Sequence, residues 1–113
     1  MSERKLQASV FEFLRLALPA DAVAYAIPMG DGRITLAPGA LSGIPDLCIV
    51  YQGRPIFIEL KTAKGAVRPS QRWVRDRLTL AGAVVTICRS VEAVEDFLAQ
   101  HIPLKASLKA RAA

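Results

Sequence analysis

Two neighbouring apolar runs in the middle of the chain constrain its fold more than any other feature. Pro45–Tyr51 and Pro55–Lys61 are rich in β-branched and aromatic residues, and the Gln52-Gly53 pair between them is typical of a hairpin turn. Both runs carry apolar residues on both faces, so each face must be covered by other parts of the protein. The pattern predicts a hairpin in the middle of a sheet, with helices packed on either side.

Three other segments have the periodicity of helices. The first covers residues 3–18, with Ser2 as its N-cap. The second covers Pro69–Ala81 and begins with a proline at a first helical position, where the missing N–H costs nothing. The third follows Ser90, which is a good N-cap residue.

Short strands are expected around the hairpin, at Val23–Ile27, Arg33–Leu36 and Ala83–Cys88, with a turn at Gly30-Asp31-Gly32. Helices and strands in this order predict an α/β domain with a mixed central sheet flanked by helices. A chain of 113 residues, 52% of them hydrophobic, suits one domain with one core. We expect that domain over residues 1–100, followed by a basic tail over residues 101–113 that is either a frayed helix or an arm lying on a phosphate backbone.

The composition excludes several classes of protein. The apolar runs are far shorter than the roughly 20 residues that cross a bilayer, and the N-terminus is charged, so neither a membrane span nor a signal peptide is expected. Cys48 and Cys88 lie in apolar strands, where reduced thiols behave as small hydrophobes, and together with the single His101 they lack the spacing of a zinc site. The expected location is cytoplasmic.

The net charge of +5 is concentrated in one segment. Six of the 15 basic residues lie between Lys61 and Arg77 against the single acid Asp76, so this segment alone carries a charge equal to that of the whole chain. A basic stripe on an otherwise neutral protein is typical of phosphate-backbone binding, which makes nucleic acid the leading partner. A solvated helix face is the alternative that charge alone leaves open.

Three charged residues interrupt the apolar hairpin. A hairpin loop of two or four residues places Asp46 opposite Glu59, whereas a loop of three residues puts them on opposite faces. Lys61 lies two positions beyond Glu59 and shares its face. Opposed carboxylates repel each other, and burying them is costly unless a proton or a cation such as Mg²⁺ or Mn²⁺ compensates. A strand-edge salt bridge between Lys61 and either carboxylate is the alternative interpretation.

The order of these residues resembles that of a known family. Gly43-Ile44-Pro45-Asp46, then Glu59-Leu60-Lys61, then Gln71 at the start of a helix, is similar to the pattern of the PD-(D/E)XK nuclease superfamily and, more narrowly, of the virus-type replication-repair nuclease (VRR-NUC) domain. Glu3 fills the place of that family's leading-helix glutamate. The resemblance extends over about residues 3–98 and implies a restriction-endonuclease-like core.

The resemblance also implies a chemistry, the metal-dependent hydrolysis of DNA phosphodiester bonds. Asp46, Glu59 and the backbone carbonyl of Leu60 would hold Mg²⁺ or Mn²⁺, with Glu3 as an additional ligand. Lys61 would orient or help to deprotonate the attacking water, and Gln71 would position Lys61 or that water. The residues expected to contact the DNA backbone are Lys64, Arg68, Arg72 and Arg75.

The expected enzyme is a structure-selective endonuclease on branched, flap or junction DNA, acting in replication, repair or recombination. It is expected to act as a homodimer, because one small chain bears one active site. A non-catalytic nucleic-acid-binding module with the same fold is the alternative, and another PD-(D/E)XK enzyme, such as a restriction or mismatch endonuclease, is a third hypothesis.

Three features near the motif have a less defined role. The connection Gly30–Ser42 is shorter than is usual in the family, and Arg68 stands where a serine cap is common, which would exchange a cap for a phosphate contact. Trp73 is interpreted as an anchor in the core or in an interface, in preference to a base-stacking role.

Overall fold

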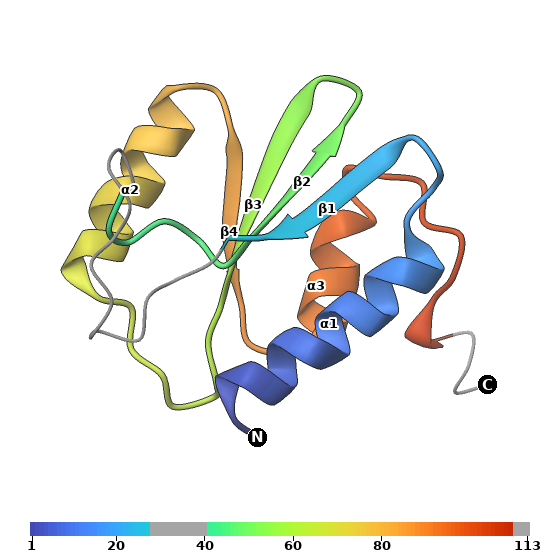
Figure 1. Cartoon of the computed structure of the whole chain (residues 1–113), viewed down its shortest axis with the longest axis horizontal. Coiled ribbons are helices and arrows are strands. Elements are labelled where there is room, and N and C mark those ends of the chain that lie inside the picture. Colours follow the sequence, from blue (N-terminus) through green and yellow to red (C-terminus); the bar gives the residue numbers. More distant parts are fainter. Residues whose placement is uncertain (28–40, 110–113) are drawn as a thin grey trace.

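The structure is a computed structural model and describes residues 1–27 and 41–109 (Figure 1). The elements follow the order α1 (Glu3–Ala17), β1 (Ala22–Ala26), β2 (Leu47–Tyr51), β3 (Arg54–Leu60), α2 (Pro69–Leu80), β4 (Val84–Cys88) and α3 (Val91–Leu98). The first six agree with the expected segments to within one or two residues at each end. α3 begins directly after Ser90 as expected, but it ends at Leu98, several residues before Pro103, where the sequence predicts its end. The expected turn at Gly30-Asp31-Gly32 and the strand at Arg33–Leu36 lie outside the described residues.

The sheet is mixed and, in the described part of the chain, has four strands in the order β1-β2-β3-β4. β1 pairs antiparallel with β2, and β2 pairs antiparallel with β3. β3 and β4 pair parallel, because the connection through α2 returns the chain to the end of the sheet at which β3 begins. Figure 1 shows α1 and α3 on one side of the sheet and α2 on the other. The predicted α/β fold, with a mixed central sheet flanked by helices, is confirmed.

A tight turn sets the register of the central hairpin. Gln52 and Gly53 both have positive φ, at 49° and 76°, as the two middle residues of a type I′ turn require. The turn pairs Tyr51 with Arg54 and, at the other end of the ladder, Leu47 with Ile58. This is the register that the two-residue loop predicts, and it places Asp46, one residue before β2, beside Glu59.

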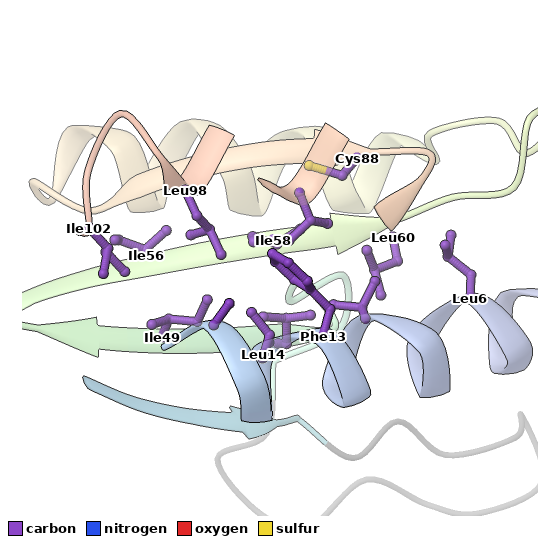
Figure 2. Packing of buried hydrophobic residues seen from close by; sticks show 14 residues of the cluster. Leu6, Phe13, Leu14, Ile49, Ile56, Ile58, Leu60, Cys88, Leu98 and Ile102 are labelled. Carbon is purple, nitrogen blue, oxygen red and sulfur yellow. The ribbon is translucent and has the colours of Figure 1, made fainter. Parts of the chain in front are cut away.

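The main core lies between the sheet and the pair α1 and α3. Alternate residues of β2 and β3 point to this side, and Figure 2 shows them packed against the apolar stripe of α1. Val10, Ile49 and Leu98 are fully buried. The buried members of this cluster are Leu6, Val10, Phe13, Leu14, Ala17, Leu47, Ile49, Ile56, Ile58, Leu60, Cys88, Val94, Leu98 and Ile102.

The other face of the sheet carries α2 and the charged residues of the hairpin. Because Ile58 and Leu60 point into the main core, strand alternation directs Glu59 and Lys61 to the α2 side. Val74 of α2 and Cys48 of β2 are buried outside the main core. Helices thus cover both faces of β3, as the apolar runs predict.

A serine side chain caps the N-terminus of each of the helices α1 and α3. Ser2 accepts a hydrogen bond from the Lys5 backbone N–H at 3.1 Å, and Ser90 accepts one from the Ala93 N–H at 3.1 Å, so both expected N-caps are confirmed.

Cys48 and Cys88 are free and buried, and burial raises the pKa of the Cys88 thiol to about 11, which keeps it protonated. No helix in the described residues is long and apolar enough to span a membrane.

Most of the segment that we expected to be a basic tail is packed on the domain. Ile102 is buried in the main core, and the Lys105 N–H donates to the Ala17 carbonyl at 2.7 Å. The buried carboxylate of Glu95 accepts hydrogen bonds from the Ser107 hydroxyl at 2.9 Å and from the Leu108 N–H at 2.5 Å. The folded body therefore continues to at least Leu108, because the acceptor that holds this segment is itself inside the domain.

Candidate active site

The charged residues of the hairpin gather at one end of the sheet. β3 and β4 are parallel, so their carboxyl ends lie side by side, and the Lys61 N–H extends their ladder by donating to the Cys88 carbonyl at 3.0 Å. β2 is antiparallel to β3, so its start lies at this same end. The topology brings Asp46 close to Glu59 and Lys61, which follow it by 13 and 15 positions in the sequence.

Backbone contacts hold Asp46 on both sides. One of its carboxylate oxygens, Oδ2, accepts a hydrogen bond of 2.6 Å from the Leu60 N–H, and its own carbonyl accepts one of 2.8 Å from the Ile27 N–H. Charge-assisted hydrogen bonds from backbone N–H groups stabilise an ionised carboxylate in a fixed orientation. Asp46 is therefore a preorganised carboxylate at the junction of β1, β2 and β3.

Glu59 is the buried member of the pair, with 5% of its surface exposed. Burial, together with the neighbouring carboxylate of Asp46 and the charge of Glu3, raises its pKa from 4.5 to about 8, and Lys61 offsets only part of this effect. At neutral pH and without a bound cation, Glu59 therefore holds a proton. A divalent cation beside the pair would replace that proton and stabilise both ionised carboxylates.

The oxygen donors at this end of the sheet fit a hard divalent cation. Asp46, Glu59 and the Leu60 carbonyl supply the carboxylate and carbonyl oxygens that Mg²⁺ and Mn²⁺ favour, and such ions complete their shell with water or phosphate. Within residues 1–27 and 41–109, no three side chains of His, Cys, Asp or Glu form a site by themselves. These residues suit an ion that is shared with a substrate phosphate rather than a closed structural site.

Lys61 is buried, and its ammonium faces Glu3 of α1. The Nζ atom lies 3.8 Å from Oε1 of Glu3, whose side chain is 56% exposed. In the described part of the chain this is the salt bridge that Lys61 makes, rather than one with Asp46 or Glu59. The structure therefore places Glu3 at the site, where it contacts Lys61. A metal-binding role for Glu3 stays a prediction.

Gln71 lies at the start of α2 and is buried, with 7% exposed. Its Oε1 accepts a hydrogen bond of 2.9 Å from the Arg68 N–H and so satisfies one of the N–H groups at the helix start. Arginine offers no acceptor, so the Arg68 side chain does not cap the helix, and the hydrogen bond from the Arg68 N–H to Gln71 is the side-chain contact at this helix start. No hydrogen bond joins Gln71 to Lys61 in the described residues, and its role toward Lys61 or water stays a prediction.

The loop that leads to Asp46 presses against the start of α2 at Gly43. This glycine has φ +88°, and a Cβ at its position would lie 2.5 Å from the backbone oxygen of Ser70. Only glycine fits both conditions, because other residues strongly disfavour this conformation and no side-chain movement relieves a clash with backbone. Gly43 thus sets the distance between the Asp46 loop and the helix that carries Gln71.

Arg89 is the site neighbour that the sequence analysis missed. It directly follows β4, and its Nη1 donates hydrogen bonds of 2.7 Å to both the Thr62 and the Gly65 carbonyls. It thereby holds the turn that comes directly after Lys61. The available signal was a basic residue that directly follows a strand. That strand, β4, is parallel to β3, at whose end Glu59 and Lys61 lie. This signal was weak, because the sequence does not show which carbonyls lie within reach.

The expected DNA-contacting residues lie at the surface beyond this turn. Lys64, Arg68 and Arg72 are exposed and Arg75 is partly buried. Their contact with DNA stays a prediction. Trp73 is 57% exposed, so it does not anchor the core, and the buried stripe of α2 is occupied by Gln71 and Val74. The other half of that expectation, an anchor in an interface, stays a prediction.

Comparison with solved structures identifies the fold. One structure described as a VRR_NUC domain matches with a TM-score of 0.64 and 22% sequence identity, over 88% of this chain and 96% of its own. A second, described as a VRR_NUC domain protein, matches with a TM-score of 0.68 and 17% identity, over 89% and 88% of the two chains. No family model and no curated protein sequence matches the chain. The fold is that of a VRR-NUC domain, a restriction-endonuclease-like α/β core, as the motif resemblance implied.

The close approach at Gly43 predicts an unusual sensitivity to a methyl group. Gly43→Ala combines the cost of a positive φ, about 1–2 kcal/mol, with the backbone clash at Ser70, so we expect it to lower the free energy of unfolding by more than that amount. Gly53→Ala is the matched control, because Gly53 also has positive φ (+76°) and no atom within 4 Å of the added Cβ. Urea denaturation measures both. Equal losses in the two variants would contradict the contact.

The protonated Glu59 predicts a stability that depends on pH. Because folding raises its pKa from 4.5 to about 8, the stabilisation is complete below about pH 4.5 and is lost as the pH rises through 8. The Tm of the metal-free protein should therefore fall between about pH 5 and about pH 9, and Glu59→Gln should remove that part of the fall. The exposed Glu12, changed to Gln, serves as control. The prediction fails if all three proteins show the same pH profile.

Proposed function

We propose that this protein is a metal-dependent nuclease that hydrolyses phosphodiester bonds of DNA. The observation that carries the proposal is the meeting of Asp46, buried Glu59 and buried Lys61 at the carboxyl end of β3. Burial of charged groups in such proximity is costly and is typical of catalytic sites. The fold of a VRR-NUC domain supports the same reading, because the sequence motif of that family falls on these residues.

Each residue has a defined task in this proposal. Asp46, Glu59 and the Leu60 carbonyl would hold Mg²⁺ or Mn²⁺, which when bound would supply a more acidic water and stabilise the charge that develops on the phosphate. The Lys61 Nζ donates hydrogen bonds to the attacking water or to a phosphate oxygen. Glu3 keeps that ammonium in place from α1, 3.8 Å away. The oxygen of the attacking water forms the new P–O bond while the P–O bond to the sugar breaks. The water loses one proton to solvent, and the leaving sugar oxygen takes one up.

The surrounding charge supports DNA as the substrate. The segment from Lys61 to Arg77 begins at the site itself and continues along α2, with six basic residues and one acid. Arg68, Arg72 and Arg75 recur at spacings of four and three, so one line along the helix offers guanidinium groups to a phosphate backbone. We propose selectivity for branched, flap or junction DNA on the resemblance alone, because phosphate contacts do not distinguish these structures from a duplex.

The central test compares the wild type with Lys61→Ala on duplex, flap, splayed and four-way-junction DNA, with Mg²⁺, Mn²⁺ or EDTA. We expect cleavage with either metal and none in EDTA, and a rate about 100-fold or more lower in Lys61→Ala, because positioned proton-transfer or orienting groups contribute factors of that size. Arg54→Ala is the charge-matched control, since Arg54 is exposed and pairs with Tyr51 at the opposite end of β3.

The same experiment separates the enzyme from a binding module. Salt-sensitive binding that is indifferent to EDTA, with no cleavage by either protein under any metal, would replace the nuclease by a non-catalytic nucleic-acid-binding module. Cleavage that survives in Lys61→Ala would remove Lys61 from the mechanism and leave the metal-bound carboxylates as the active groups.

We propose a homodimer as the active form, because a chain with one site cuts two strands of a junction most simply as a symmetric pair. Sedimentation of the protein with junction DNA at micromolar concentration should show two protein chains in each complex. A complex that contains a single 12.2 kDa chain would contradict the dimer and leave the nuclease proposal intact.

A further inference from the structure

The single tryptophan of the chain is exposed on α2. Trp73 keeps 57% of its surface accessible. Among the described helices, α2 is the one on its side of the sheet (Figure 1), and a stripe formed by Gln71 and Val74 faces the strands beneath it. A large apolar ring on the remaining surface does not contribute to the core, and an exposed aromatic residue is a common feature of binding surfaces.

The surroundings of Trp73 favour a nucleic-acid partner. The guanidinium carbon of Arg77, one turn along the helix, lies 5.7 Å from the centroid of the indole. Arg68, Arg72, Arg75 and Arg77 are all on or next to α2, against the single acid Asp76. An aromatic ring set in a basic surface complements a strand that carries both phosphates and bases with exposed faces.

The indole occupies a different flank of α2 from the phosphate-facing arginines. With 100° between successive helical residues, Trp73 lies about 100° from Arg72 and about 160° from Arg75, whereas Trp73 and Arg77 lie about 40° apart. The helix therefore has a guanidinium flank, formed by Arg68, Arg72 and Arg75, and an indole flank, formed by Trp73 and Arg77. A ligand that contacts the indole flank need not be the duplex that the guanidinium flank tracks.

We propose that Trp73, with Arg77 beside it, is a stacking platform for the unpaired bases of a nucleic-acid strand. Bases inside a duplex present no free face to such a ring, so the platform selects substrates that have a single-stranded part. The inference rests on the proposed function for its biological meaning, since it names the substrate class of that nuclease. Its physical content, contact between the indole and unpaired bases, is independent of cleavage.

The single tryptophan makes this contact directly measurable. The wild-type protein, in EDTA to prevent cleavage, is titrated with a dT oligonucleotide and with an abasic phosphodiester strand of the same length while tryptophan fluorescence is recorded. Both strands carry the same charge, and only the first has bases. We expect the dT strand to quench the indole strongly and the abasic strand to leave it nearly unchanged at saturation.

Binding of the variants is then measured by the anisotropy of labelled DNA. Trp73→Ala should weaken binding of the dT strand by about tenfold and leave blunt duplex binding within about twofold, and Trp73→Phe should restore part of the loss. Arg72→Ala, on the guanidinium flank, should weaken both ligands. Leu16→Ala, at a 48% exposed position on α1, is the control that should change neither.

Several results would overturn the platform. Equal quenching by dT and abasic strands, or equal losses of duplex and single-strand binding in Trp73→Ala, would show an electrostatic contact without stacking. Indole fluorescence that shifts with protein concentration, and a smaller sedimentation coefficient in Trp73→Ala, would instead make this flank an interface between two copies. Quenching by dT in a protein that never cuts DNA would keep the platform and reject the nuclease.

Discussion

The pairing register of β2 with β3 is the constraint on which the site depends. Gln52 and Gly53 close the hairpin with two positive φ angles, and from that turn the ladder runs to Leu47 and Ile58 without a bulge. A shift of one residue would move Glu59 to the face that α1 and α3 cover and would direct Ile58 or Leu60 toward α2. The tight turn at one end of the hairpin therefore decides whether two carboxylates meet at the other end, five pairs away.

The meeting of those carboxylates opposes folding, and the surrounding structure offsets the cost. Asp46 accepts a hydrogen bond from the Leu60 N–H, whereas Glu59 is neutralised because burial and the neighbouring Asp46 raise its pKa to about 8. Lys61 is buried beside them with Glu3 as its partner 3.8 Å away. A cation that displaces the Glu59 proton would relieve the repulsion, so the same arrangement that lowers stability at high pH favours metal binding. Folding stability and the proposed metal binding thus depend on the same Glu59 proton.

The sequence predicts what depends on local chemistry and fails where distant segments touch. Turn residues, N-caps and apolar periodicity gave all seven described elements and the position of Asp46 opposite Glu59. The contact of Gly43 with Ser70, the bonds of Arg89 to two carbonyls and the anchoring of Ser107 by Glu95 join positions more than ten residues apart. No periodicity encodes such contacts. The sequence analysis therefore assigned no role to Arg89 and interpreted the segment after residue 100 as a basic tail.

The surface position of Trp73, where the sequence favoured an anchor in the core or in an interface, has a more specific cause. Tryptophan is usually an anchor because it buries more apolar area than other residues, but that argument requires a second layer to bury it against. α1 and α3 pack on each other as well as on the sheet, whereas among the described helices α2 packs on the sheet alone. Its inward stripe is filled by Gln71 and Val74, of which Gln71 is committed to the helix start. In the described part of the chain, one exposed flank of α2 carries guanidinium groups and the other an indole. If both flanks bind DNA as proposed, phosphate contact and base contact are divided between two sides of the helix that follows β3.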